Sequence, residues 1–229
     1  MSRSKKKPAD SPDDALPKAV GHRLSLYLRE LQRLLSDGQE TTSSGRLGQL
    51  LGISDAQVRK DLTYFGHFGY PGVGYRCDEL IDAIRRILGT DHRWKVAMIG
   101  VGNLGRALLG YRGFAQQSFD LAAAFDVDQS LVGRPIDEVM VYHLDSLDET
   151  VRRLRIKLAM IAVPATAAQE VADRLVSTGI EGVVNFAPVT IQLPEGVSLI
   201  GVDLAIEMEQ LTFAALNRLR EDRSATDGD

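Results

Sequence analysis

The sequence predicts an α/β protein built in two parts, a small helical segment followed by an open, mostly parallel sheet. Two observations support this prediction. Between residues 21 and 89, leucines recur at helical spacing and the pattern is interrupted by glycines. From residue 95 onward, short apolar runs alternate with helical stretches, which is typical of strands in a parallel sheet.

The composition excludes several classes of protein. The one cysteine, Cys77, allows no internal disulfide; it fits a reducing compartment and is expected to be a packed residue rather than a reactive thiol. No apolar run approaches the ~20 residues that span a bilayer. Prolines and aspartates follow Lys5, Lys6 and Lys7, where a signal peptide needs an apolar core. We therefore expect a cytoplasmic protein without a membrane partner.

Charge is shared unevenly along the chain. Residues 1–90 hold 14 Lys and Arg against 11 Asp and Glu, hence +3, whereas residues 91–229 hold 13 against 20, hence −7. A basic front half is a weak indication that this half meets a polyanion.

The first twenty residues are polar and proline-containing, and we expect a disordered tail over residues 1–20. Its lysine run would be solvated or would touch phosphates. Leu24, Leu28, Leu31 and Leu35 then form one apolar stripe, which predicts a helix that ends at Gly38.

Two short helices joined at Gly52 follow. Hydroxyl side chains at residues 41–44 would cap the first helix, and Ser54 with Gln57 would form a capping box on the second. Val58, Leu62 and Phe65 would point inward. This pattern predicts a helix-turn-helix, whose second helix reads DNA in the major groove. Its candidate DNA-binding residues are Ser54, Gln57, Arg59, Lys60, Thr63 and Tyr64.

A glycine- and aromatic-rich stretch, residues 66–76, predicts the two-stranded wing of a winged helix. Tyr70, Gly72, Gly74 and Arg76 would lie along a DNA groove, while His67 is expected to be a loop residue rather than a metal ligand, since no second ligand lies at metal spacing. A further amphipathic helix ends at Gly89. The alternative for this domain, residues 21–90, is a helical accessory domain with a solvated face.

Residues 95–128 read as a strand, a glycine turn, a helix and a second strand that ends in a carboxylate. Gly100 would allow the turn, Gly102 the close approach of a pyrophosphate, and Gly105 the packing of helix on strand. Asp126, about 20 residues farther on, would accept hydrogen bonds from a ribose 2′-hydroxyl and repel a 2′-phosphate. This pattern favours NAD(H) over NADP(H), with a purely structural turn as the alternative.

Further strands are predicted at residues 140–142, 156–163 and 198–202, and residues 183–188 are predicted to be a strand with its exit loop, which makes residues 91–206 a Rossmann-type domain. Ligands of such sheets bind at the carboxyl ends of the strands. The loops there would surround the nicotinamide. Their residues are Val163, Pro164, Asn185, Phe186, Ala187, Pro188 and Asp203.

A last helix is predicted from residue 207 to residue 220, apolar around much of its surface. Such a helix must be covered, either by its own domain or by a second copy of the chain. We favour the second copy and expect a dimerisation helix over residues 207–222, followed by a disordered tail over residues 223–229.

The sequence favours binding over catalysis. A dehydrogenase needs an acid or base near the carbonyl it reduces. Lys157 begins a buried strand, His143 follows a short strand, and Tyr111 and Asp203 form no clear acid–base pair. A small NAD-dependent oxidoreductase and a CoA-binding domain are the rival interpretations, and the latter would have little use for Asp126.

Five stretches together resemble the Rex family of redox-sensing transcriptional repressors, from about residue 20 to residue 220. They are residues 58–66 (VRKDLTYFG), 69–75, 100–105, 125–128 (FDVD) and 185–188 (NFAP). The resemblance implies a homodimer that exchanges C-terminal helices and binds operator double-stranded DNA of respiratory and fermentative genes. NADH would release it and NAD⁺ would permit binding, with no metal involved.

The resemblance also implies roles for residues. Arg59 and Lys60 would contact bases or phosphates, and a switch would link Arg29, Tyr111 and Asp203; Leu204 stands where some relatives carry an aromatic residue. The full set of candidate cofactor contacts is Gly100, Val101, Gly102, Asn103, Leu104, Gly105, Asp126, Val127, Val163, Pro164, Asn185, Phe186, Ala187, Pro188 and Asp203.

Overall fold

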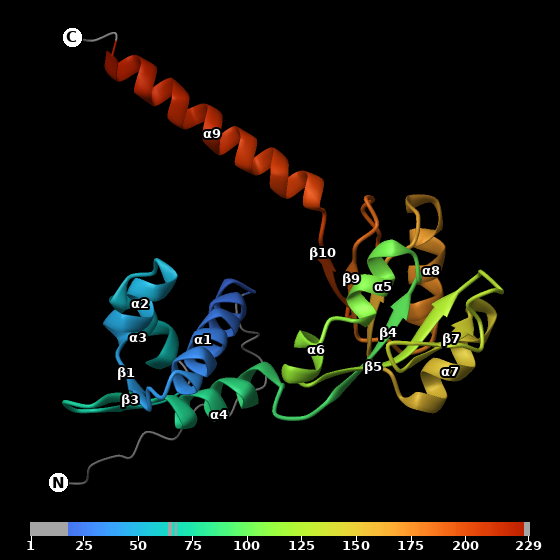
Figure 1. The fold of residues 1–229 in the computed structure, drawn as a ribbon, viewed down its shortest axis with the longest axis horizontal. Helices are drawn as coiled ribbons and strands as arrows, with labels where there is room; N and C mark the ends of the chain where they lie inside the picture. Colours follow the sequence, from blue (N-terminus) through green and yellow to red (C-terminus); the bar gives the residue numbers. More distant parts are fainter. Residues whose placement is uncertain (1–17, 64–65, 67, 227–229) are drawn as a thin grey trace. The chain divides into compact units, whose positions relative to one another are not determined.

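The structure is a computed structural model that describes residues 18–63, 66 and 68–226. The chain divides into two compact units, with the boundary between His92 and Arg93 (Figure 1). Most of the N-terminal tail with Lys5–Lys7, and the candidate residues Tyr64, Phe65 and His67, lie outside the described residues.

The first unit is a winged helix. Its elements are α1 (Lys18–Ser36), β1 (Thr41–Thr42), α2 (Ser44–Leu51), α3 (Asp55–Thr63), β2 (Gly69–Tyr70), β3 (Gly74–Arg76) and α4 (Cys77–Leu88). The three strands form one antiparallel sheet in the order β1-β3-β2. Helix α1 begins at Lys18, three residues before the sequence pattern does. The expected helix-turn-helix and wing are both present.

The core of this unit explains why the sequence folds this way. The stripe on α1 is buried through Leu24, Leu28 and Leu31, together with Tyr27 and Leu34, whereas Leu35 is 40% exposed. Val58 and Leu62 bring α3 onto the same core, as the sequence pattern predicts. Cys77 is fully buried here, and burial raises the pKa of its thiol, which suits a packed rather than a reactive residue.

The second unit is a Rossmann-type sheet in the order β10-β9-β8-β4-β5-β7-β6, parallel except for β6. Its strands are β4 (Trp94–Ile99), β5 (Phe119–Asp126), β6 (Pro135–Ile136), β7 (Val139–His143), β8 (Leu158–Ile161), β9 (Gly182–Asn185) and β10 (Ser198–Gly201). Strand β4 lies between β5 and β8, so the order of the strands reverses at its carboxyl end. This reversal is the switch point at which such sheets bind ligands.

Helices cover the two faces of the sheet unequally. On one face, α7 (Leu147–Leu154) and α8 (Ala165–Ser177) pack on β4, β5, β8 and β9 through one large apolar cluster. On the other face, α5 (Asn103–Leu109) and α6 (Gly113–Gln116) follow the glycine turn. A largely apolar hollow remains on that second face, lined by strands β4, β5, β8, β9 and β10 and by Phe114.

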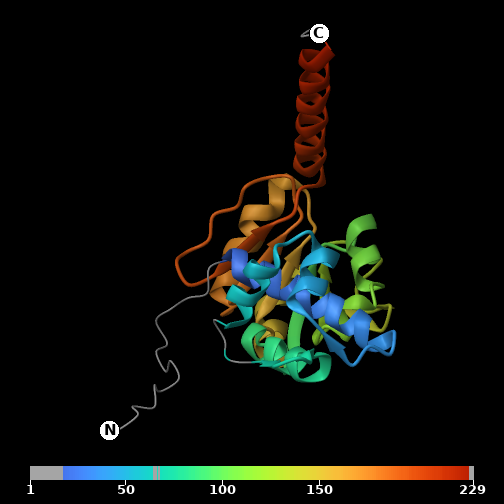
Figure 2. The same cartoon turned by 90° about the vertical axis from the view of Figure 1, so that its left-hand side faces the viewer.

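The last helix, α9, runs from Leu204 to Thr226 and so extends the expected helix at both ends. It begins early because the side chain of Asp203 accepts a hydrogen bond from the amide of Ala205 (2.9 Å) and caps it. In both views α9, drawn in red, leaves the sheet and extends away from it (Figures 1 and 2). None of the described helices is long and apolar enough to cross a membrane.

The sequence pattern did not predict three elements of the second unit: helix α6, which has only four residues, helix α7 and strand β6. Helix α7 is short and half of its eight residues are charged, and β6 has only two residues, so neither carries a long apolar period. The short 3₁₀ turn at Leu144–Ser146 leads from β7 into α7.

Candidate functional site

The three glycines after β4 differ in why a side chain would be excluded at each position. Gly100 has φ +93°, and a Cβ there would lie 2.5 Å from the carbonyl oxygen of Ala162. A Cβ on Gly105 would collide with the carbonyl oxygen of Gly100. Gly102 is extended, with φ −71°, and a Cβ there would meet no atom within 4 Å. The chain itself therefore requires glycine at 100 and 105 but not at 102, where a ligand could approach the backbone.

Asp126 ends β5 beside this turn. Its Oδ2 accepts a hydrogen bond from the amide of Val101 (2.6 Å), and its Oδ1 accepts one from the amide of Asp128 (2.9 Å). The carboxylate thus holds the glycine turn and the exit of β5 together. Each carboxylate oxygen can accept more than one hydrogen bond, so the acid keeps capacity for a ribose hydroxyl.

Arg106 is a candidate that sequence reasoning missed. It follows the third glycine, and its Nε donates to the carbonyl oxygen of Val101 (3.1 Å). Asp128 lies close enough for the two charges to interact: its pKa is lowered first by hydrogen bonds from Ser130 and, to a smaller extent, by Arg106. The sequence shows only a single arginine directly after the glycine motif. Its role becomes visible in the structure, where α5 directs its side chain back to the glycine turn.

The predicted loops gather at one edge of the sheet, because β8, β9 and β10 are parallel and end there. Ala187, Pro188 and Asp203 line one pocket together with Asn185. Val163 and Pro164 follow β8, and the backbone of Gly100 packs against Ala162 and Val163. The carboxyl edge thus carries the candidates on which the sequence reasoning placed the nicotinamide.

Asn185 is buried, and its side-chain amide is engaged within the chain. Its Nδ2 donates to the carbonyl oxygens of Ala187 (3.2 Å) and Val189 (2.8 Å), and its Oδ1 accepts from the amide of Ala187 (3.0 Å). Asn185 therefore shapes the loop that carries Ala187 and Pro188.

The candidate catalytic groups are spread apart. Lys157 precedes β8 at the amino edge of the sheet and pairs with Glu181 at 2.6 Å. His143 ends β7 directly beside Asp126, and its Nδ1 lies 3.1 Å from a carboxylate oxygen of Asp145. Of these two groups, only His143 lies at the carboxyl ends of the strands, on the side of β5 and β7 rather than that of β8, β9 and β10.

In the first unit, the outward face of α3 carries Arg59, Lys60 and Thr63, all exposed. Ser54 caps the helix, since its Oγ accepts from the amide of Gln57 (3.2 Å). The other half of the expected capping box differs: the side chain of Gln57 turns away and donates to Asp61 (2.7 Å). Arg59 Nη1 lies 2.8 Å from the carboxylate of Asp55.

The wing, residues 69–76, is held by its neighbours. Tyr70 donates to Glu79 Oε2 (3.1 Å), and this hydrogen bond raises the pKa of the Tyr70 hydroxyl. Arg76 pairs with Asp78 (3.2 Å) and Glu79 (3.3 Å), and the bond to Asp78 raises the pKa of its guanidinium. The chain itself requires glycine at position 74, where φ is +93° and a Cβ would collide with the carbonyl oxygen of Thr42. Gly72, with φ +78°, makes the turn.

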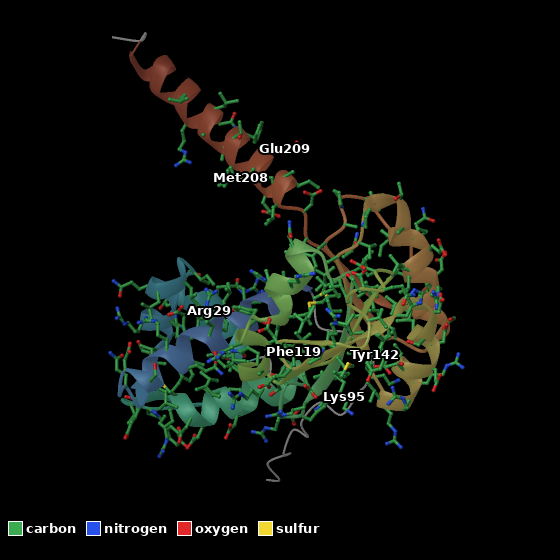
Figure 3. All side chains as sticks on the ribbon, turned by 45° about the vertical axis from the view of Figure 1, so that its right-hand side comes forward. Arg29, Lys95, Phe119, Tyr142, Met208 and Glu209 are labelled. Atoms are coloured by element: carbon green, nitrogen blue, oxygen red, sulfur yellow. The ribbon has the colours of Figure 1, made fainter. Side chains whose placement is uncertain are left out.

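The three predicted switch residues are divided between the units: Arg29 belongs to the first, and Tyr111 and Asp203 belong to the second, which does not bring the two together. Arg29 lies on α1 in the first unit, its side chain 67% exposed (Figure 3). Tyr111 is 59% exposed and packs edge-on against Phe114 in a pocket with residues at the amino ends of β4 and β5. Asp203 caps α9 at the opposite, carboxyl edge. Tyr111 and Asp203 thus lie at opposite edges of one sheet.

A winged helix joined to a Rossmann-type sheet defines a class of two-domain proteins in which a DNA-reading unit accompanies a nucleotide-binding unit. Within that class, the chain belongs to the Rex family of redox-sensing transcriptional repressors. It is 45% identical over 198 residues to the "Redox-sensing transcriptional repressor Rex" of Carboxydothermus hydrogenoformans, covering 86% of this chain and 95% of that one. It is 47% identical to the repressor of the same name from Rhodopirellula baltica, covering 87% and 84%.

Solved structures agree with this assignment. The fold matches RSP, a Rex-family repressor, in complex with beta-NAD⁺ and operator DNA, at TM-score 0.85 and 31% identity, covering 95% of this chain and 100% of that one. It matches RSP in complex with beta-NADH at TM-score 0.82 and 31% identity, covering 92% and 99%. Two family models match parts of the chain: "CoA binding domain" over residues 91–189 and "Putative DNA-binding protein N-terminus" over residues 15–63.

Proposed function

We propose that this protein is a transcriptional repressor that binds operator DNA through its winged helix and is released when NADH binds its Rossmann unit. The observation that carries the proposal is the coupling of the two units in one chain, with relatives solved both on operator DNA with NAD⁺ and with NADH. A cofactor that only reports the NADH/NAD⁺ ratio needs a binding site and no catalytic pair.

The glycine turn and Asp126 support NAD(H) as the ligand. The open space at Gly102 and the amides at the start of α5 suit a pyrophosphate. Asp126, beside the glycine turn, would hold the adenosine ribose and repel a 2′-phosphate. This carboxylate also argues against CoA, which carries a phosphate on its ribose. Asp126 also holds the glycine turn through the amide of Val101, so the carboxylate and the turn belong to one site.

The nicotinamide half would lie among the loops after β8, β9 and β10. Oxidation places a positive charge on the nicotinamide ring, so a site near Asp203 can distinguish NAD⁺ from NADH by charge. To shift the repressor from 1:99 to 99:1 between two states, the nucleotide must bind one of them about 5.5 kcal/mol more tightly. A charged carboxylate beside the reactive ring is a source for part of that difference.

On the DNA side, we assign contacts with bases and phosphates to the exposed face of α3, with Arg59 and Lys60 as the charged members. The wing would enter the adjacent minor groove with Tyr70 at its tip. Arg76 must exchange its carboxylate partners Asp78 and Glu79 for phosphates, which leaves those two acids to limit non-specific binding.

Two apolar surfaces support a homodimer. Helix α9 exposes apolar side chains on several sides, at 48–72% of their full area, among them Met208, which stands clear of the sheet in Figure 3. Its apolar residues are Leu204, Ile206, Met208, Leu211, Phe213, Leu216 and Leu219. The sheet offers the apolar hollow that includes Ile200, itself 62% exposed. We propose that each copy inserts α9 against its partner, so that both surfaces are covered.

The switch fits the same arrangement. Tyr111 and Asp203 of one chain lie at opposite sheet edges, so a direct link between them requires a second copy. We propose that Asp203 exchanges partners between Arg29 and Tyr111 as the nucleotide changes, and that this exchange sets the separation of the two recognition helices. They must stand about 34–36 Å apart to read a two-fold operator.

The deciding experiment is a gel shift with the full-length protein on a palindromic duplex, with NAD⁺, NADH or NADPH added, at several salt concentrations. We expect the protein to stay bound to the duplex in the presence of NAD⁺ and to be released by NADH. Equal occupancy with both nucleotides would contradict the proposal. Steady consumption of NADH with a carbonyl substrate would instead support the oxidoreductase that His143 leaves as the second candidate.

A further inference from the structure

The recognition helix α3 contains a buried carboxylate, Asp61, that is only 4% exposed. Four hydrogen bonds converge on it. Arg23 donates from Nε (2.6 Å) and from Nη2 (2.8 Å), the Tyr27 hydroxyl donates at 2.9 Å, and the Gln57 amide donates at 2.7 Å. Arg23 and Tyr27 lie on α1, so this cluster ties the recognition helix to the first helix.

A buried carboxylate is costly unless it is fully paired, and here it is paired on both oxygens. Burial raises its pKa, but the hydrogen bonds from Arg23, Tyr27 and Gln57 outweigh burial and leave the pKa below the usual value. Tyr27 is fully buried beside it, and burial followed by the bond to Asp61 raises the pKa of its hydroxyl. Asp61 is thus a charged anchor between α1 and α3.

The consequence of the anchor lies in Gln57, one turn earlier on α3 and half-buried. Its Nε2 gives one hydrogen to Asp61 Oδ1. That bond restrains the orientation of the amide. Within the described residues the bond to Asp61 is the one side-chain hydrogen bond of Gln57, which leaves Oε1 as an acceptor and the second hydrogen of Nε2 as a donor. An acceptor and a donor therefore remain side by side in a restrained orientation.

We propose that Asp61 is a positioning residue for operator recognition, which holds the Gln57 amide so that it reads an adenine in the major groove. This inference rests on the DNA-binding function proposed above. A glutamine amide pairs with adenine through N6 and N7, one hydrogen bond in each direction. An unrestrained glutamine loses side-chain conformational entropy when it binds a base. The hydrogen bond to Asp61 already restrains Gln57 before DNA binds, so less entropy is lost on binding.

The test uses the full-length protein and a two-fold duplex selected by the wild-type chain from a random library. Each adenine of the half-site is replaced in turn by 7-deazaadenine, which lacks the N7 acceptor. For the wild type, we expect the substitution at one adenine to lower the affinity for the duplex roughly 5- to 10-fold, because it removes one hydrogen bond. Gln57→Ala should abolish this position's sensitivity. Asp61→Asn should reduce it below about 2-fold.

The matched control is Asp82→Asn, which makes the same substitution at an exposed carboxylate on α4 and should keep the full sensitivity. A purely structural role of Asp61 would lower affinity for all duplexes equally and leave the 7-deazaadenine penalty intact, which would overturn the proposal. So would a wild type with no sensitive adenine. NADH release of the wild-type complex is measured in the same assay, so a failure of the proposed repressor function is seen separately.

If Asp61→Asn does not fold, the wild-type protein still decides the question. Relaxation of the Gln57 side-chain amide, measured by NMR on the DNA-free protein, should report an order parameter near that of rigid backbone, about 0.85. A value below about 0.6 describes a mobile side chain and would overturn the proposal.

Discussion

Replacing Gly102 by alanine separates what the chain needs at this position from what a bound nucleotide needs. The backbone of Gly102 is extended and a Cβ would meet no atom within 4 Å, so the folded chain can accept the methyl group. A pyrophosphate that approaches the Gly102 backbone could not accept it.

The two effects have opposite signs. Alanine has fewer conformations than glycine in the unfolded chain, so Gly102→Ala should stabilise the second unit by about 0.4–1 kcal/mol. Hydrogen bonds to charged groups are worth about 1.5–3 kcal/mol, so displacing the pyrophosphate by one methyl group should weaken NADH binding by about 10- to 150-fold.

Urea unfolding and NADH fluorescence titration measure these effects on the same sample. Gly105→Ala is the matched control, because its Cβ would collide with the Gly100 carbonyl; overpacking of this kind costs about 1–3 kcal/mol, so this variant should lose stability as well as binding. The reasoning is refuted if Gly102→Ala binds NADH like the wild type, or if it unfolds as easily as Gly105→Ala.

Three further predictions concern the acid, the anchor and the last helix. Asp126→Asn should lower the preference for NADH over NADPH at least about fivefold, because a carboxylate and a phosphate about 4 Å apart repel by about 1 kcal/mol even in water; an unchanged preference in paired titrations would count against this role. The pKa of Asp61 is lowered in the folded state from its usual 3.8, so its stabilising contribution is complete above that value and is lost as the pH falls below it. Urea unfolding of the first unit at pH 5 and pH 3 should show this loss in the wild type and a smaller loss in Asp61→Asn. Phe213→Glu on α9, where the ring is 67% exposed, should give monomers in analytical ultracentrifugation, and a dimer of unchanged affinity would contradict the helix exchange.

The sequence was sufficient wherever a local pattern carried the physics. The three glycines and Asp126 lie in one stretch, so their spacing alone predicted the turn, the helix and the acid that the structure joins through Val101. The winged helix followed from leucine spacing, the Ser54 cap and the glycine-rich wing.

The sequence was insufficient where the partners are far apart along the chain. Asp61 stands in a polar stretch that reads as a solvated face, and only folding brings Arg23 and Tyr27 to it from 38 and 34 residues away. The expected capping box at Gln57 is only half formed for a related reason: Asp61, which its distant partners hold in the core, accepts a hydrogen bond from the Gln57 amide.

If α9 is covered by a second copy, the stability of this protein depends on its concentration. If a second copy covers α9, the longest described helix, dimerisation stabilises the fold by mass action, and the melting temperature should rise with protein concentration. Newly made chains without a partner would expose the apolar side chains of α9 to proteases and chaperones. The concentration of intact dimer would then increase more than in proportion to the rate of synthesis.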